Sequence, residues 1–236
     1  MNRVTNHDSV ALAKEAAQLL AAHIQTHQSG GVLVLFSGGS ALSVVDHLPK
    51  TVFGDRCTVS VVDERYTHDT THHNFYNVIA RLKAHTIAVP QTIDTTVQKE
   101  ESFEEYVQRV AAAHTQWHAT HPQGKVVALF GIGEDGHTAG IFPAAHTTFI
   151  DAYERADAIV PVLEGKAHAP FCERITISLP YIRTISDAVV YVVGENKRAA
   201  VQRVCGNVGS LATTPARVFR ELRSATLCTS STTDMI

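Results

Sequence analysis

The sequence lacks the features that mark secreted, membrane-spanning or thiolate-metal proteins. Its 236 residues include only four cysteines, none of them in a C-x-x-C pair: Cys57, Cys172, Cys205 and Cys228. Dispersed thiols are typical of a reducing compartment rather than of a disulfide scaffold. No apolar run approaches the ~18 residues of a membrane span, and residues 1–8 are polar, without the apolar core of a signal peptide. The sequence therefore predicts a cytoplasmic protein with no membrane partner.

An excess of charge of one sign is also missing. Twenty basic and 23 acidic residues give a formal net charge of −3, which argues against a nucleic-acid partner. An anionic substrate would then need a few local cations rather than the field of the whole molecule. The chain has no internal repeat and no linker-like stretch, so residues 1–236 are expected to form a single domain. A monomer and a small homo-oligomer are both compatible with this composition.

The most informative stretch is an apolar run followed by a glycine-rich loop. Residues 126–130 show no alternation, which predicts a strand buried on both faces, as in a parallel sheet. The loop 131–143 then sets four glycines around Asp135 and His137. Its first part spells the dinucleotide fingerprint G-x-G-x-x-G, but Gly140 and Pro143 interrupt the helix that the fingerprint requires. We therefore expect the loop to carry chemistry at the carboxyl end of a strand and not to bind a dinucleotide.

A second buried strand, predicted for residues 32–36, opens into a serine- and glycine-rich turn. The turn consists of Ser37, Gly38, Gly39 and Ser40, and a helix is predicted to follow over residues 41–48. A strand, a glycine turn and a helix N-terminus can bind phosphate through free N–H groups and the helix dipole. The same residues also suit a tight connection with a serine cap, and their spacing does not distinguish the two.

Charged residues follow two other predicted strands. Residues 57–62 lead into Asp63, Glu64 and Arg65, which form either a solvated corner or one wall of the same cleft. Residues 188–193 lead into Lys197 in a first helical turn, where a cation opposes the helix dipole unless an anion is shared there. Further strands are expected at 158–163 and 174–179, further helices at 9–28, 74–84, 99–121 and 215–222, and a frayed Ser/Thr-rich tail after them.

Clustered histidines raise the question of a metal site. His114, His118 and His121 share one face of the predicted helix 99–121, at a spacing that suits zinc. His72 and His73 are adjacent and so are poorly placed to face one ion. Because no carboxylate accompanies the three helical histidines, a solvated helix face is favoured, and no metal is expected.

Four of these segments, in this order, resemble the 6-phosphogluconolactonase family, which is related to glucosamine-6-phosphate isomerase/deaminase. They are SGGS at 37–40, DER at 63–65, GIGEDGHTAGIFP at 131–143 and GENK at 194–197, with RITI at 174–177 as a fifth. The third motif is long and specific, and the others are individually weak. The resemblance covers roughly residues 9–205. After Ser40 this chain has Ala41-Leu42, where the family usually continues Thr-Pro.

The resemblance implies a doubly wound α/β fold, with a mostly parallel sheet and helices on both faces, and the hydrolysis of 6-phospho-D-glucono-1,5-lactone without a metal or cofactor. It implies a phosphate loop at Ser37, Gly38, Gly39 and Ser40, phosphate-binding cations at Arg65 and Lys197, and a general base at His137. Asp63, Gly133 and Arg174 are expected to contribute to the same substrate site. An imidazole suits the base role because its ordinary pKa lies near neutrality, and N–H groups of the glycine loop are candidates for holding the oxyanion. Asp135 either orients the imidazole or binds a sugar hydroxyl.

Two other functions remain open at this stage. The related deaminase has a similar loop, in which a glutamate follows the histidine by five residues; this chain has Phe142 there. The deaminase pattern also usually has tyrosine where this chain has Arg65. A sugar-phosphate sensor without catalysis would keep the phosphate loop and lose His137. The lactonase is the favoured hypothesis.

Overall fold

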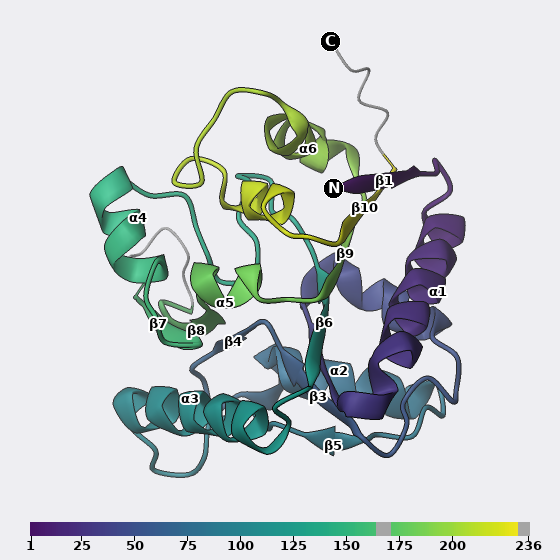
Figure 1. Cartoon of the computed structure of the whole chain (residues 1–236). Coiled ribbons are helices and arrows are strands. Elements are labelled where there is room, and N and C mark those ends of the chain that lie inside the picture. The colour runs from purple at the N-terminus through teal and green to yellow at the C-terminus, as the bar shows by residue number, and fades with distance from the viewer. Residues whose placement is uncertain (164–170, 231–236) are drawn as a thin grey trace.

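The computed structural model describes residues 1–163 and 171–230, which form two β-sheets surrounded by helices (Figure 1). The larger sheet has seven strands, all parallel, in the order β1-β10-β9-β6-β2-β3-β5. Its strands are β1 (Asn2–Thr5), β2 (Val32–Phe36), β3 (Cys57–Val61), β5 (Gln91–Thr92), β6 (Lys125–Phe130), β9 (Asp187–Val192) and β10 (Ala225–Thr229). From β2 the chain proceeds outward to β3 and β5, then returns to the other side of β2 and proceeds through β6, β9 and β10.

The central strands are buried on both faces, as their unbroken apolar runs predict. Along β2, Leu33 and Leu35 belong to one buried cluster, whereas Val34 and Phe36 belong to another. This alternation follows from the two-residue period of a strand, which points successive side chains to opposite faces of the sheet. Each face therefore requires its own cover of helices.

Helices cover both faces of the sheet. Helix α1 (Ser9–His27), the 3₁₀ segment η2 (Gly39–His47) and α2 (Asn74–Ala84) contribute to the cluster that holds Phe36. The other face is covered by α3 (Phe103–Thr120), α4 (His146–Tyr153), α5 (Leu179–Arg183), α6 (Arg198–Cys205) and the 3₁₀ segment η6 (Pro215–Arg220). Figure 1 shows α1 on one side of β6 and α5 on the other. The doubly wound α/β fold is thus confirmed. No helix within residues 1–163 and 171–230 has the length and apolarity of a membrane span.

The smaller sheet corrects the interpretation of residues 63–65 as a possible solvated corner. Its three antiparallel strands are β4 (Asp63–Arg65), β8 (Glu173–Ile177) and β7 (Ile159–Leu163), with β8 in the middle. Val62 joins β3 to β4: its N–H donates to the Phe36 carbonyl in the large sheet, and its own carbonyl accepts from Ile177 N–H in the small one. One extended stretch therefore links the two sheets and brings the DER residues to the carboxyl edge of the large sheet.

Several other elements differ from the expectation in type, bounds or existence. The segments expected to be helical at 41–48 and 215–222 are helical, but both are 3₁₀ helices, η2 and η6. Helix α3 begins at Phe103 and not at residue 99, because Ser102 and Glu105 form a capping box at its start. Residues 225–229 of the tail expected to fray form the buried strand β10, while residues 231–236 lie outside the described part. Strands β1 and β5 and helices α4 and α5 were not anticipated.

Candidate active site

The two glycine-rich loops meet at the point where the strand order reverses. β2 and β6 are neighbours, but their connections lead to opposite sides of the sheet, and such switch points are where ligands bind in open α/β sheets. The loops that follow β2 and β6 line a cavity of ≈140 Å³ together with one residue that follows β9. Its lining residues are Ser37, Gly38, Gly39, Ser40, Gly131, Ile132, Gly133, His137, Ala139 and Lys197.

His137 is held in one orientation by its own loop. Its Nδ1 lies 2.6 Å from Asp135 Oδ1, and its backbone N–H donates to the same oxygen at 3.0 Å. Partial burial opposes ionisation of Asp135, but the hydrogen bonds from His137 outweigh it and lower the pKa of Asp135 to about 2. An ionised carboxylate only accepts hydrogen bonds, so Nδ1 carries the proton and Nε2 is the acceptor in a neutral ring. This geometry favours the orienting role for Asp135.

Gly133 makes this arrangement sterically possible. A methyl group on its α-carbon would lie 2.0 Å from His137 Nδ1 and 2.8 Å from Asp135 Oδ1. The Gly133 N–H donates to the His137 carbonyl at 2.8 Å, so the loop closes tightly around the imidazole. Only glycine allows so close an approach of backbone to a side chain.

Phe142 and Arg174 extend the site on the other side of the imidazole. The ring centroid of Phe142 lies 4.9 Å from that of His137, and Phe142 is 3% exposed. Arg174 Cζ lies 5.3 Å from the Phe142 centroid, a cation–π geometry. Thr176, two residues further along β8, accepts from the Gly140 N–H at 3.0 Å and so fixes the far end of the loop. Phe142 is thus an apolar wall beside the imidazole.

Asp63 and Arg65 lie at the paired ends of β4 and β8. Arg65 is opposite Arg174 in the register, and Asp63 is opposite Thr176. Burial raises the pKa of Asp63, and the charges of Arg65, Arg174 and His137 oppose this rise. Arg65 Nη1 donates to the His72 carbonyl at 2.8 Å, while its buried Nε makes no hydrogen bond within the described residues.

Lys197 reaches the cavity from the segment that follows β9. It ends the 3₁₀ segment η5 (Glu195–Lys197) and caps α6, so it precedes the first helical turn in which it was expected. Its Nζ lies 4.0 Å from Glu134 Oε1, to which Asn196 Nδ2 donates at 2.5 Å. Arg203 Nη2 donates to the Glu134 carbonyl at 2.9 Å. Glu134, which the sequence did not single out, thus joins the loop of His137 to the segment of Lys197.

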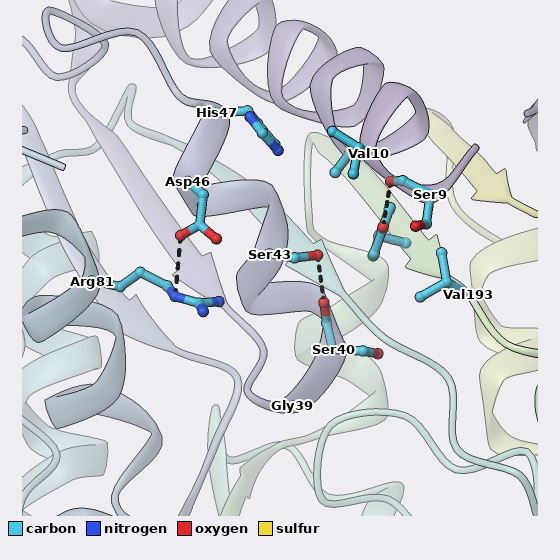
Figure 2. Close-up of a pocket in the computed structure, with 11 residues that line it drawn as sticks. Ser9, Val10, Gly39, Ser40, Ser43, Asp46, His47, Arg81 and Val193 are labelled. Carbon is cyan, nitrogen blue, oxygen red and sulfur yellow. Dashed lines mark hydrogen bonds and ion pairs between the residues drawn. The ribbon is translucent and has the colours of Figure 1, made fainter. Parts of the chain in front are cut away.

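A larger cavity, of ≈520 Å³, also borders the turn that follows β2 (Figure 2). It shares Gly39 and Ser40 with the first cavity, but neither His137 nor Lys197 lines it. Figure 2 shows two contacts that hold this region: Ser43 Oγ donates to the Ser40 carbonyl at 2.8 Å, and Arg81 Nε pairs with Asp46 Oδ1 at 3.1 Å. His137 and Lys197 therefore meet only at the smaller of these two cavities.

Most of the residues expected at the site line the cavity, but some do not. Seven of them line the ≈140 Å³ cavity: Ser37, Gly38, Gly39, Ser40, Gly133, His137 and Lys197. Asp135 contacts His137 directly, whereas Asp63, Arg65 and Arg174 lie at the β4–β8 edge and are not among the lining residues. Asn74, whose side chain lies against Gly38, was not singled out from the sequence.

Two of the three clustered histidines face a tyrosine hydroxyl, and the third stacks on a tryptophan. His114 Nδ1 and His118 Nε2 lie 3.4 Å and 2.9 Å from the Tyr181 hydroxyl, and His121 stacks on Trp117. Within residues 1–163 and 171–230, no group of three or more His, Cys, Asp or Glu side chains is placed to hold a metal ion. The preferred interpretation as a solvated face is wrong for His114, which is fully buried.

Comparison with known proteins identifies the family. The family model described as glucosamine-6-phosphate isomerases/6-phosphogluconolactonase matches residues 7–228, and the chain belongs to this family. A probable 6-phosphogluconolactonase 1 of Arabidopsis thaliana is 29% identical over 209 residues, which make up 82% of this chain and 74% of that protein. The 6-phosphogluconolactonase of Nostoc sp. is 28% identical over 216 residues, or 84% of this chain and 82% of that protein.

Solved structures agree in fold. The 6-phosphogluconolactonase from Trypanosoma brucei superposes with a TM-score of 0.77 at 19% identity, covering 97% of this chain and 95% of that one. The 6-phosphogluconolactonase from Shewanella baltica has a TM-score of 0.72 at 20% identity, with the same coverage. At these identities the likeness establishes the fold.

Proposed function

We propose that this chain hydrolyses 6-phospho-D-glucono-1,5-lactone to 6-phospho-D-gluconate, with His137 as general base and no metal ion. The observation that carries the proposal is the 2.6 Å contact between His137 Nδ1 and Asp135 Oδ1 in a loop that lines a cavity with Lys197. It leaves Nε2 as the proton acceptor of a neutral imidazole. Family membership and the names of the relatives support the choice of substrate.

The reaction requires a base, an anion site and a place for oxyanion charge. Nε2 of His137 takes a proton from water, whose oxygen attacks the lactone carbonyl carbon. The tetrahedral intermediate collapses with cleavage of the bond to the ring oxygen, which receives the proton from the imidazolium; the new carboxylic acid then ionises. Asp135 stabilises the imidazolium without itself being protonated, as its pKa of about 2 requires.

The substrate-binding groups follow from their positions. Lys197 and the loop Ser37–Ser40, which line the cavity, hold the phosphoryl group, and Arg65 adds a second cation from the β4–β8 edge. Asp63 and Arg174 contact the sugar from the β4–β8 edge. The N–H groups of Gly133, Gly136 and Gly140 already donate within the protein, so other groups that line the cavity hold the oxyanion.

The related deaminase is the second candidate, and Phe142 argues against it. The position five residues after His137 carries a buried phenyl ring, which neither accepts nor donates a proton. A non-catalytic sensor would not need the His137–Asp135 pair. The chain is therefore expected not to release ammonia from glucosamine 6-phosphate; sustained release that His137→Ala abolishes would select the deaminase instead.

The deciding assay uses freshly generated 6-phosphogluconolactone with its spontaneous hydrolysis subtracted. His137→Ala should lower kcat by about 10²–10⁴, the usual contribution of a general base, with a smaller effect on KM. His7→Ala is the matched control, because this exposed histidine follows the edge strand β1, which β10 and β9 separate from β6. Activity should survive EDTA. Full activity of folded His137→Ala would refute the role of His137 as general base. Inactivation by EDTA with rescue by zinc would refute the metal-independent route.

A further inference from the structure

A buried carboxylate that the proposed reaction does not use lies between two of the phosphate-binding segments. Glu64 is fully buried, in the middle of β4 between Asp63 and Arg65. Its Oε1 accepts from the N–H groups of Arg65 at 2.9 Å and Asn74 at 2.8 Å. Its Oε2 accepts from the Phe75 N–H at 2.8 Å and from Thr95 Oγ1 at 3.3 Å. Both oxygens are thus saturated by fixed donors.

These bonds make Glu64 the N-terminal cap of α2. The preceding residue, His73, provides no side-chain cap, so the first N–H groups of the helix depend on a carboxylate ten residues earlier in the chain. The positive end of the helix dipole favours an anion at this point. Because Glu64 fills that position and also binds the Arg65 N–H, it joins the start of α2 to the strand that carries Arg65.

Asn74 extends this connection to the phosphate loop. It is 3% exposed, and its Nδ2 donates to the Asp63 carbonyl at 2.9 Å. Its Oδ1 lies so close to Gly38 that a methyl group on the Gly38 α-carbon would be 2.1 Å away. Gly38 lines the cavity that also holds Lys197. The Asn74 side chain thus contacts the loop at Gly38 and at the same time donates a hydrogen bond to β4.

The other end of α2 is fastened to the same loop region. Arg81 Nε and His85 Nε2 lie 3.1 Å and 3.0 Å from Asp46 Oδ1, and Asp46 belongs to η2, which directly continues the loop (Figure 2 shows the Arg81–Asp46 pair). Helix α2 is therefore attached to the loop segment near both of its ends and to β4 at its start. The distance between Gly38 and Arg65 depends on where α2 begins.

We propose that Glu64 and Asn74 are positioning residues for phosphate binding: Glu64 clamps the start of α2 to β4, and Asn74 thereby sets the distance between the loop Ser37–Ser40 and Arg65. This inference rests on the proposed function for the nature of the ligand. Neither residue contacts the phosphoryl group, and both act through the groups that do.

The test measures anion binding separately from turnover. Inorganic phosphate and 6-phosphogluconate are titrated calorimetrically into the parent protein, Glu64→Gln and Asn74→Ala. Glu64→Gln places an NH₂ group, which donates, against backbone N–H groups that also donate. Asn74→Ala removes the side chain that lies against Gly38. Each variant should bind both ligands about tenfold more weakly and raise KM by a similar factor, with kcat within about threefold, because the net contribution of a hydrogen bond that orders an anion site is about that large.

The matched control is Asp8→Ala, which also removes a carboxylate cap, in this case from the N–H groups of Val10 and Ala11 at the start of α1. It should lose thermal stability without loss of phosphate affinity. Since the two residues act as one unit, Glu64→Gln/Asn74→Ala should be no weaker in binding than the weaker single variant.

The outcomes separate this inference from the proposed function. A parent that binds phosphate but does not hydrolyse the lactone would refute the function, while weaker binding by the variants would still support the positioning role. Unchanged phosphate affinity in folded Asn74→Ala, additive losses in the double variant, or no phosphate binding by the parent would overturn the positioning role. If Glu64→Gln does not fold, Asn74→Ala alone decides.

Discussion

The smallest feature on which the site depends is a missing methyl group. His137, Asp135 and Gly133 occupy so little space that a β-carbon on Gly133 would lie 2.0 Å from His137 Nδ1. The imidazole therefore keeps its carboxylate partner only because residue 133 has no side chain. The sequence identified all three residues, but it left open whether Asp135 orients the ring; the 2.6 Å contact is what favours that role.

Gly133→Ala should accordingly lower kcat by about 10²-fold or more, because displacement of a general base removes most of its contribution. The fold should survive, since the added methyl group is confined to the loop. Steady-state kinetics and circular dichroism of the variant provide the measurement. Gly131→Ala, whose added methyl group would meet nothing closer than 3.9 Å, should lose much less activity. Equal activity of Gly133→Ala and the parent would mean that the loop tolerates another geometry for His137.

At the scale of elements, the site is built from strand ends. Lys197 follows β9 and Arg65 ends β4, so the two proposed phosphate-binding cations come from different sheets. Arg65→Ala and Lys197→Ala should each weaken binding of 6-phosphogluconate by about 10–100-fold, since a hydrogen bond to a charged group contributes about 1.5–3 kcal/mol. Calorimetry measures this directly.

The control for these two variants is Lys125→Ala, an exposed lysine at the amino end of β6 and hence at the opposite edge of the sheet. It removes the same charge from the net balance and should bind 6-phosphogluconate as the parent does. If all three variants bind equally well, the phosphate site lies elsewhere on the molecule.

Strands with continuous apolar runs could be predicted from the sequence, and those with mixed composition could not. Residues 126–130 and 32–36 lie in β6 and β2, because burial on both faces leaves an unbroken apolar pattern. Strand β10 contains two threonines and was expected to fray, but its residues are buried between β1 and β9, where the backbone ladder and burial outweigh local composition. Strand β4 could not be recognised from its three charged residues, because its partner β8 lies 109–113 residues further along the chain.

At the scale of the whole molecule, two buried groups should give stability opposite dependences on pH. Burial raises the pKa of Glu64 from 4.5 to about 7 against the opposition of its backbone donors. Its contribution to the free energy of unfolding is then complete below pH 4.5 and is lost as pH rises through 7. Burial, aided by His118, lowers the pKa of His114 from 6.5 to about 4. Its contribution is complete above pH 6.5 and is lost as pH falls through 4.

Replacing either group should therefore remove its own contribution to the pH dependence of stability and leave that of the other. As pH increases from 4.5 to 6.5, the unfolding free energy of Glu64→Gln should rise relative to that of the parent, and that of His114→Phe should fall relative to it. Each change should amount to about 2–3 kcal/mol, from pKa shifts of this size. Urea unfolding at intervals across this range measures both differences. Two curves parallel to that of the parent would show that neither group titrates as its burial requires.

The pairing of β1 with β10 has a consequence for the nascent chain during its synthesis. Asn2 pairs with Thr226 and Thr5 with Thr229, so the edge strand is synthesised 224 residues before its partner. At roughly 5–20 residues per second, β1 leaves the ribosome on the order of tens of seconds before β10 exists. During that interval its backbone donors and acceptors have no native strand to pair with, and a nascent chain stalled before residue 225 has to shield them in another way.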